Sequence, residues 1–83
     1  MDDKIHLPKK EPDIKLKPVM SSNISGAGYD PATETLEIKY SNGAVYRYEN
    51  VPQEVYNSMW SAESVGKFVR ENIAKSYQYK KVK

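Results

Sequence analysis

The chain has 83 residues, which is enough for one small domain that buries only about 60% of its unfolded surface. It contains no cysteine and a single histidine, which argues against a disulfide framework and against a zinc site. The apolar residues are scattered, and no run is long enough for a signal peptide or a membrane span. We expect a soluble, cytoplasmic protein that binds neither a cofactor nor a membrane.

Positive charge is concentrated near the C-terminus. From residue 65 onwards, six Lys or Arg residues accompany one carboxylate, Glu71, so this third carries a net charge of +5 and the preceding residues carry −3. A basic stretch of this kind is typical of proteins that bind a polyanion. A solubilising tail would have the same composition, and this alternative remains open.

Residues 1–18 form a predicted disordered or extended leader. Prolines at positions 8, 12 and 18 interrupt any helical period, and the few apolar residues are isolated. An alternative is an extended segment that docks on the domain through Ile14 and Leu16. After the leader, residues 19–30 favour a strand, and the glycines at 26 and 28 indicate a bulge or a close approach of another backbone.

The clearest pattern is a β-hairpin over residues 36–51. In residues 35–40 apolar or aromatic side chains alternate with charged ones, and in residues 44–49 Ala44, Tyr46 and Tyr48 alternate with Val45, Arg47 and Glu49. Strict alternation is typical of strands with one buried face. The predicted inward side chains are Leu36, Ile38 and Tyr40 on the first strand and Ala44, Tyr46 and Tyr48 on the second.

The loop length decides which side chains of the hairpin face each other. A two-residue loop, Asn42-Gly43, would pair Ile38 with Arg47 and so place an apolar residue opposite a charged one. A three-residue loop, Ser41-Asn42-Gly43, with Gly43 left-handed in a bulge, gives each apolar residue an apolar or aromatic partner. We therefore predict the longer loop. The resulting pairs are Leu36–Tyr48, Ile38–Tyr46 and Glu37–Arg47.

Two amphipathic helices are predicted after the hairpin. Pro52 suits the first position of a helix over residues 53–61, in which Val55 and Met59 lie one turn apart. Ser61 or Ser64 caps a second helix that extends to about Lys75. Its buried stripe consists of Val65, Phe68, Val69 and Ile73, extended by Tyr77 if the helix continues.

Three stretches could bind a ligand. Tyr46 and Tyr48 could stack on bases, although the predicted register turns both toward the core. Ser64, Gly66 and Lys67 could hold an anion at a helix start, or could be a plain helix cap with a close-packing glycine. The basic and aromatic end, residues 77–83, would suit either a nucleic-acid backbone or a short edge strand protected by lysines.

Several of these residues together resemble the KTSC domain, a short bacterial and phage module named for its place at the C-terminus of some lysyl-tRNA synthetases. The resemblance covers roughly residues 19–79 and also fits members that stand alone. It implies RNA binding through the company that the domain keeps, and it places the family's tyrosine motif on Tyr46 and Tyr48 and its serine–glycine element on Ser64 and Gly66. The matching residues are Ser21-Ser22-Asn23-Ile24, Gly28-Tyr29-Asp30, Leu36, Ile38, Gly43, Tyr46, Tyr48, Val51-Pro52, Ser64, Gly66-Lys67, Ile73 and Tyr77.

The sequence thus predicts an α+β domain over residues 19–79 and a basic tail over residues 80–83. The predicted domain has a small antiparallel sheet of about three strands, which is built on a central hairpin and packs against two C-terminal helices.

With no credible catalytic set, we expect a non-enzymatic module that binds RNA or a phosphate-bearing nucleotide. The alternative is a protein-interaction module, for example a phage-encoded accessory protein that acts on a host factor, with Tyr56 or Trp60 exposed. The oligomeric state is not predicted. The candidate ligand-binding residues are Ser22, Asn23, Tyr46, Tyr48, Ser64, Gly66, Lys67, Arg70 and Lys75.

Overall fold

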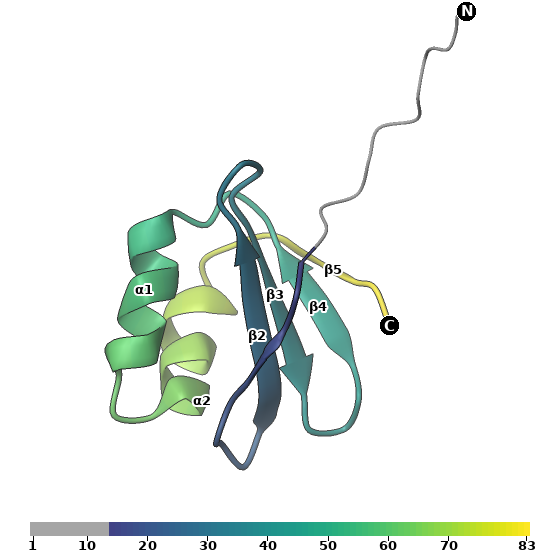
Figure 1. Cartoon of the computed structure of the whole chain (residues 1–83), viewed down its shortest axis with the longest axis vertical. Coiled ribbons are helices and arrows are strands. Elements are labelled where there is room, and N and C mark those ends of the chain that lie inside the picture. The colour runs from purple at the N-terminus through teal and green to yellow at the C-terminus, as the bar shows by residue number, and fades with distance from the viewer. Residues whose placement is uncertain (1–13) are drawn as a thin grey trace, which may run out of the picture.

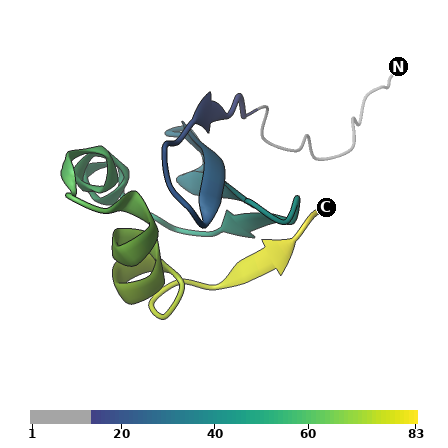
Figure 2. The ribbon, with the colours of Figure 1, turned by 90° about the horizontal axis from the view of Figure 1, so that it is seen from below.

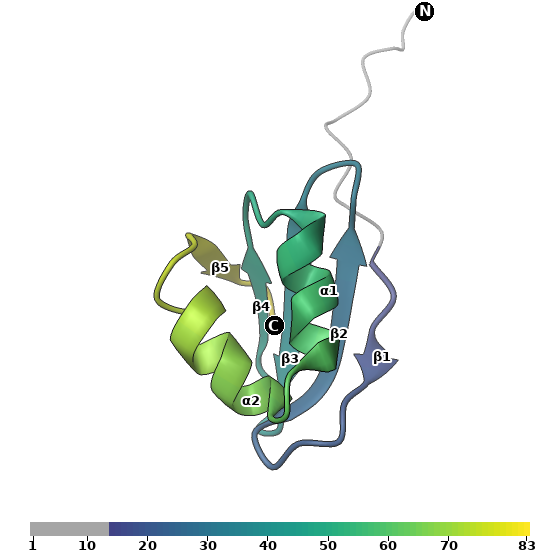
Figure 3. The ribbon, with the colours of Figure 1, turned by 90° about the vertical axis from the view of Figure 1, so that its left-hand side faces the viewer.

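The structure is a computed structural model, and it describes residues 14–83. Five antiparallel strands form one sheet in the order β1-β2-β3-β4-β5, and the helices lie across one of its faces (Figures 1 and 3). The elements in chain order are β1 (Lys17–Pro18), β2 (Ile24–Asp30), β3 (Thr35–Tyr40), β4 (Val45–Tyr48), α1 (Gln53–Ser61), α2 (Val65–Phe68), the π-helix η1 (Val69–Ile73) and β5 (Tyr79–Lys81).

The α+β class is confirmed, but the prediction of about three strands was wrong, because two edge strands add to the sheet. β1 has two residues and pairs with β2, and β5 has three residues and pairs with β4. Figure 2 shows them at opposite ends of the curved row of strands. β5 confirms the alternative of a short edge strand within residues 77–83. β1 was assigned to the leader, because Pro18 disfavours a strand.

The predicted register of the central hairpin is confirmed. Leu36 pairs with Tyr48 and Ile38 with Tyr46. The loop has three residues: the Tyr40 N–H donates to the Ala44 carbonyl at 2.8 Å, and Gly43 has a φ of +93°. A positive φ of this kind favours glycine, which explains the residue at this position.

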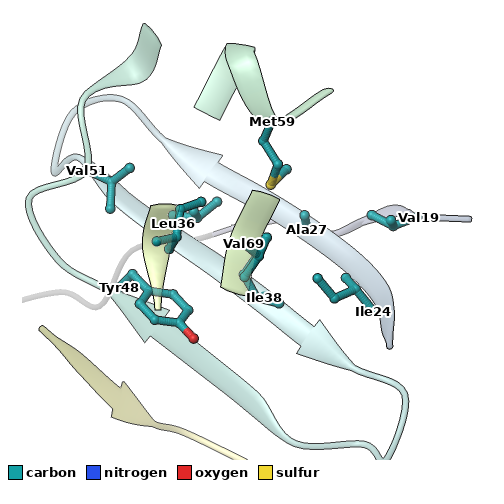
Figure 4. Packing of buried hydrophobic residues seen from close by; sticks show 10 residues of the cluster. Val19, Ile24, Ala27, Leu36, Ile38, Tyr48, Val51, Met59 and Val69 are labelled. Atoms are coloured by element: carbon teal, nitrogen blue, oxygen red, sulfur yellow. The ribbon is translucent and has the colours of Figure 1, made fainter. Parts of the chain in front are cut away.

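Helices and sheet bury one apolar core between them. Figure 4 shows Met59 of α1 and Val69 of η1 on the side of the sheet where Leu36, Ile38 and Tyr48 lie. Val19, which precedes β2, and Val51, which follows β4, complete the core. The buried members are Val19, Ile24, Ala27, Leu36, Ile38, Tyr48, Val51, Met59, Val69 and Ile73.

The two helices begin close to where the sequence placed them. α1 covers the predicted residues, with Pro52 at its N-cap and not at its first helical position. Ser64 caps the second helix, since its Oγ accepts a hydrogen bond from the Lys67 N–H at 3.1 Å. This helix widens into the π-helix η1 and ends at Ile73, earlier than predicted. None of the helices in the described part of the chain has the length and apolar character needed to cross a membrane.

The end of the predicted leader lies on the sheet. Residues 1–13 are outside the described residues, whereas residues 14–18 are extended and include β1. Ile14 and Leu16 are half-buried. Gly28 faces away from the helices, because its partner is Glu37 on the outer face. A Cβ at Gly28 would lie 2.4 Å from the Lys15 carbonyl oxygen and 2.6 Å from Ile14 Cγ2. The bare backbone at Gly28 is therefore what lets this segment cross the outer face.

We expect Gly28→Ala to lower the free energy of unfolding by about 1–3 kcal/mol, the usual cost of forcing an extra methyl into a packed site. Urea unfolding monitored by Trp60 fluorescence would measure it. Gly26→Ala is the matched control, because a Cβ there would lie 3.4 Å from Leu16 Cβ, an ordinary contact. Equal midpoints for the two variants would show that the crossing at Gly28 contributes nothing to stability.

Candidate functional site

A hollow of about 520 Å³ opens where the hairpin tip, β5 and the end of η1 meet. Its lining combines four tyrosines with four short amide or hydroxyl side chains and two alanines. No charged residue is among them. The lining residues are Ser22, Asn23, Tyr40, Ser41, Asn42, Ala44, Tyr46, Tyr48, Ala74 and Tyr79.

The four tyrosine rings form one continuous aromatic surface. The ring of Tyr79 lies 5.1 Å from that of Tyr46 and 5.7 Å from that of Tyr48, measured between centroids, and Tyr40 meets Tyr46 edge-on at 5.4 Å. Rings at these separations touch each other, so no ligand ring fits between them. A planar ligand would instead stack on the outer side of the cluster, where Tyr79 is 52% exposed.

Tyr48 belongs to the core and to the hollow at once. Its side chain is 2% exposed, and its hydroxyl lies 2.7 Å from the hydroxyl of Tyr40, with either atom as the donor. Burial raises the pKa of Tyr48 far above its usual value, and the hydrogen bond to Tyr40 raises it further. Burial also raises the pKa of Tyr40. The hydroxyl pair, which like any phenol is neutral at physiological pH, therefore stays neutral further into alkali and offers hydrogen bonds without charge.

Two loops provide the polar end of the hollow. Ser41 donates its N–H to the Asn23 carbonyl at 2.8 Å and its Oγ–H to the Ser22 carbonyl at 3.0 Å. The Asn42 Oδ1 accepts the Ala44 N–H at 3.0 Å. These bonds fix the tip of the hairpin against the turn that precedes β2. The loops thus bring amide and hydroxyl groups into the same lining as the tyrosines.

The predicted anion-binding element lies beside the hollow and does not line it. The hydroxyl of Ser64 caps the helix. Gly66 is buried, and a Cβ there would lie 2.9 Å from the Oγ of Ser21 and 3.8 Å from Nδ2 of Asn23. The space next to Gly66 is filled by protein, so close packing explains this glycine, as the alternative interpretation had it. Lys67 is exposed beside it.

Of the remaining predicted site residues, the structure brings four into the hollow: Ser22, Asn23, Tyr46 and Tyr48. Arg70 and Lys75 are exposed on the helix end that contributes Ala74 to the lining. Sequence reasoning missed Tyr40, Ser41 and Asn42 as site residues. Tyr79 lies in the stretch 77–83 that was considered for nucleic-acid binding, but it was not among the candidate ligand-binding residues. The alternation of β3 already turned Tyr40 toward Tyr46, whereas Tyr79 could be placed only once β5 was paired with β4. Within residues 14–83 no group of three or more potential metal ligands occurs.

Comparison with known proteins agrees with this fold. Residues 20–79 match the family model described as KTSC domain. The crystal structure of a KTSC domain protein from Yersinia pestis has a TM-score of 0.80 to this chain at 33% sequence identity; the match covers 86% of this chain and all of that one.

Curated relatives fall into two kinds. A protein of Tsukamurella paurometabola is 48% identical over 54 residues, which are 65% of this chain and 81% of the relative, and an uncharacterized protein of Stutzerimonas stutzeri is 43% identical over 65% of this chain and 76% of its own length. A lysine–tRNA ligase of a Nostoc species is 31% identical over 67 residues, 81% of this chain but 12% of the ligase.

The neutral state of Tyr48 predicts a loss of stability in alkali. Above about pH 10 the unfolded chain loses the phenolic proton that the folded chain keeps, so the free energy of unfolding falls as the pH rises, by up to about 1.4 kcal/mol per pH unit for one such tyrosine. Urea titrations between about pH 9 and pH 11 would measure the slope. In Tyr48→Phe the slope should be shallower, and an unchanged slope would contradict this assignment.

Proposed function

The chain belongs to the KTSC domain family, and we propose that it is a non-catalytic module whose tyrosine-lined hollow binds a base of RNA or of a nucleotide. The observation that carries the proposal is the lining itself, which combines a touching set of four aromatic rings with uncharged amides and hydroxyls. Such a surface fits a flat, neutral ring with hydrogen-bonding edges, which is the description of a nucleobase.

Stacking supplies the affinity in this proposal. A base that stacks on an aromatic side chain gains about 1–3 kcal/mol, largely whatever its identity. Tyr79 is the most exposed ring of the cluster and rests on Tyr46 and Tyr48, so it presents a braced platform. Asn23 and Asn42 lie in the same lining and could exchange hydrogen bonds with the edge of the stacked base.

The chemistry of the lining supports binding and not catalysis. It contains no carboxylate, histidine or cysteine, and burial keeps the phenols of Tyr40 and Tyr48 protonated. None of these groups is a general base or an activated nucleophile near neutral pH. The relation to a lysine–tRNA ligase, an enzyme whose name states that it acts on tRNA, favours RNA among ligands that carry a base.

The protein-interaction alternative has one feature in its favour. Trp60 of α1 is 37% exposed and meets Tyr56 edge-on at 6.0 Å between ring centroids. Tyr56 is itself stacked on Tyr29 at 4.9 Å, which holds it against the sheet. One partly exposed ring is small beside the few hundred Å² of apolar surface that mark a protein interface. We therefore rank this function second.

Fluorescence anisotropy of labelled single-stranded RNA at low salt tests the proposal. Tyr79→Ala should weaken binding about 5- to 150-fold, which corresponds to the loss of one stacked base. Binding should also weaken steeply as the salt concentration rises.

Trp60→Ala is the control, because it removes a partly exposed aromatic side chain from α1 and leaves the hollow intact. It should retain the affinity of the unmodified chain. If neither RNA nor mononucleotides bind at low salt, the proposed function fails. If Trp60→Ala weakens binding as much as Tyr79→Ala does, the hollow is not the binding site.

A further inference from the structure

The hollow is neutral inside, but cations lie around it. One of these cations, Arg70, lies where η1 borders the hollow. Phe68 borders a groove beside α1, and Val69 and Ile73 are buried in the core, so Arg70 falls on the remaining side of the helix. Ala74, four residues later and thus next to Arg70 on the helix surface, lines the hollow. Arg70 therefore stands at the helix border of the hollow, and Lys75 follows Ala74 directly.

A second cation lies on the strand side. In the β4–β5 pair, Lys81 is opposite Tyr46 and Tyr79 is opposite Tyr48. Opposite residues of an antiparallel pair share a face, so Lys81 lies on the same face as the tyrosine surface. Lys83 lies two residues beyond Lys81, and its backbone carbonyl accepts the Val45 N–H at 3.1 Å.

On the other face of the sheet, two cations form ion pairs. Arg47 there bonds Glu37 at 2.6 Å, and Lys80 lies 3.7 Å from Glu49. By contrast, no ion pair is found within residues 14–83 for the four cations that border the hollow, Arg70, Lys75, Lys81 and Lys83. Arg47 and Lys80 on the outer face thus have carboxylate partners, whereas Lys39 on that face and the four cations around the hollow have no ion pair within residues 14–83.

From this arrangement we infer that the hollow takes an internal nucleotide of a single-stranded RNA, with its base on the tyrosine surface and a phosphate toward each border. The inference rests on the proposed function and narrows it. A mononucleotide carries its phosphate on one side of the base and can approach Arg70 or Lys81, but not both. A nucleotide inside a chain has a phosphodiester on either side and meets both cations. The chain of a polymer should therefore bind better than the free monomer.

The experiment compares four ligands with the full chain by calorimetry at low salt. They are adenosine 5′-monophosphate, adenosine 3′-monophosphate, adenosine 3′,5′-bisphosphate and an adenosine hexanucleotide. The bisphosphate is the smallest molecule with a phosphate on each side, so it should bind tighter than either monophosphate, and the hexanucleotide should bind at least as tightly. Equal affinity for all four would overturn the inference while leaving base binding in place. No binding by any of them would remove the proposed function itself.

Charge variants separate the two borders. Arg70→Gln and Lys81→Gln should each lower the slope of log affinity for the hexanucleotide against log salt by about 0.7, the value for one lost phosphate contact on a single strand. Lys80→Gln is the matched control, because this lysine is next in sequence to Lys81 but lies on the outer face beside Glu49. It should leave the slope unchanged.

The two borders also differ in which monophosphate they affect. If Arg70 and Lys81 meet phosphates on opposite sides of the base, one variant should weaken the 5′-monophosphate and the other the 3′-monophosphate. Loss of the same monophosphate in both variants, or equal slope changes in Lys80→Gln and Lys81→Gln, would overturn the two-sided arrangement.

Discussion

The register of the β3–β4 hairpin is the constraint on which the rest of the structure depends. A three-residue loop closed by Gly43, with its φ of +93°, sets Ile38 opposite Tyr46. Since side chains alternate along a strand, this single choice sends the apolar set to the helices and the Glu37–Arg47 pair to the outer face. A slip by one residue would reverse the two faces and leave the helices without an apolar surface to cover. The hollow would be lost with the core, because its tyrosines come from the same face.

The same alternation places neighbouring lysines of the basic C-terminus on opposite faces of the sheet. As a composition, Lys80 and Lys81 are indistinguishable members of a tail. Once β5 pairs with β4, Lys80 lies beside Glu49 and Lys81 lies on the face of Tyr46 and Tyr79. What net charge alone indicated, a basic end that could attract a polyanion, becomes a distinction between neighbouring side chains.

The elements that could be predicted from the sequence are those whose stabilising contacts lie within a few residues of each other. The hairpin register, α1 and the Ser64 cap were predictable, because alternation, helical spacing and capping chemistry act within a few residues. β1 was assigned to the leader, since Pro18 has a poor strand preference, and the edge strand in residues 77–83 stayed one of two alternatives, because it depends on pairing with β4, far earlier in the chain. For Gly28 and Gly66 the sequence offered close packing as one interpretation, but the neighbours that require it, Lys15 and Ser21, are known only from the fold. Tyr79 could be assigned to the hollow only from the pairing of β5 with β4.

An open hollow lowers the stability of so small a domain, and this cost favours a role for the hollow in binding a ligand. A chain of this length has little apolar surface to bury, and it would gain stability by filling the space beside Tyr48 with aliphatic side chains. Instead it places small polar residues on one side and leaves the Tyr79 ring half exposed on an edge strand. Departures from the most stable packing are expected where a surface serves a ligand. The register that builds the core also keeps this space open, so stability and the proposed binding depend on the same hairpin.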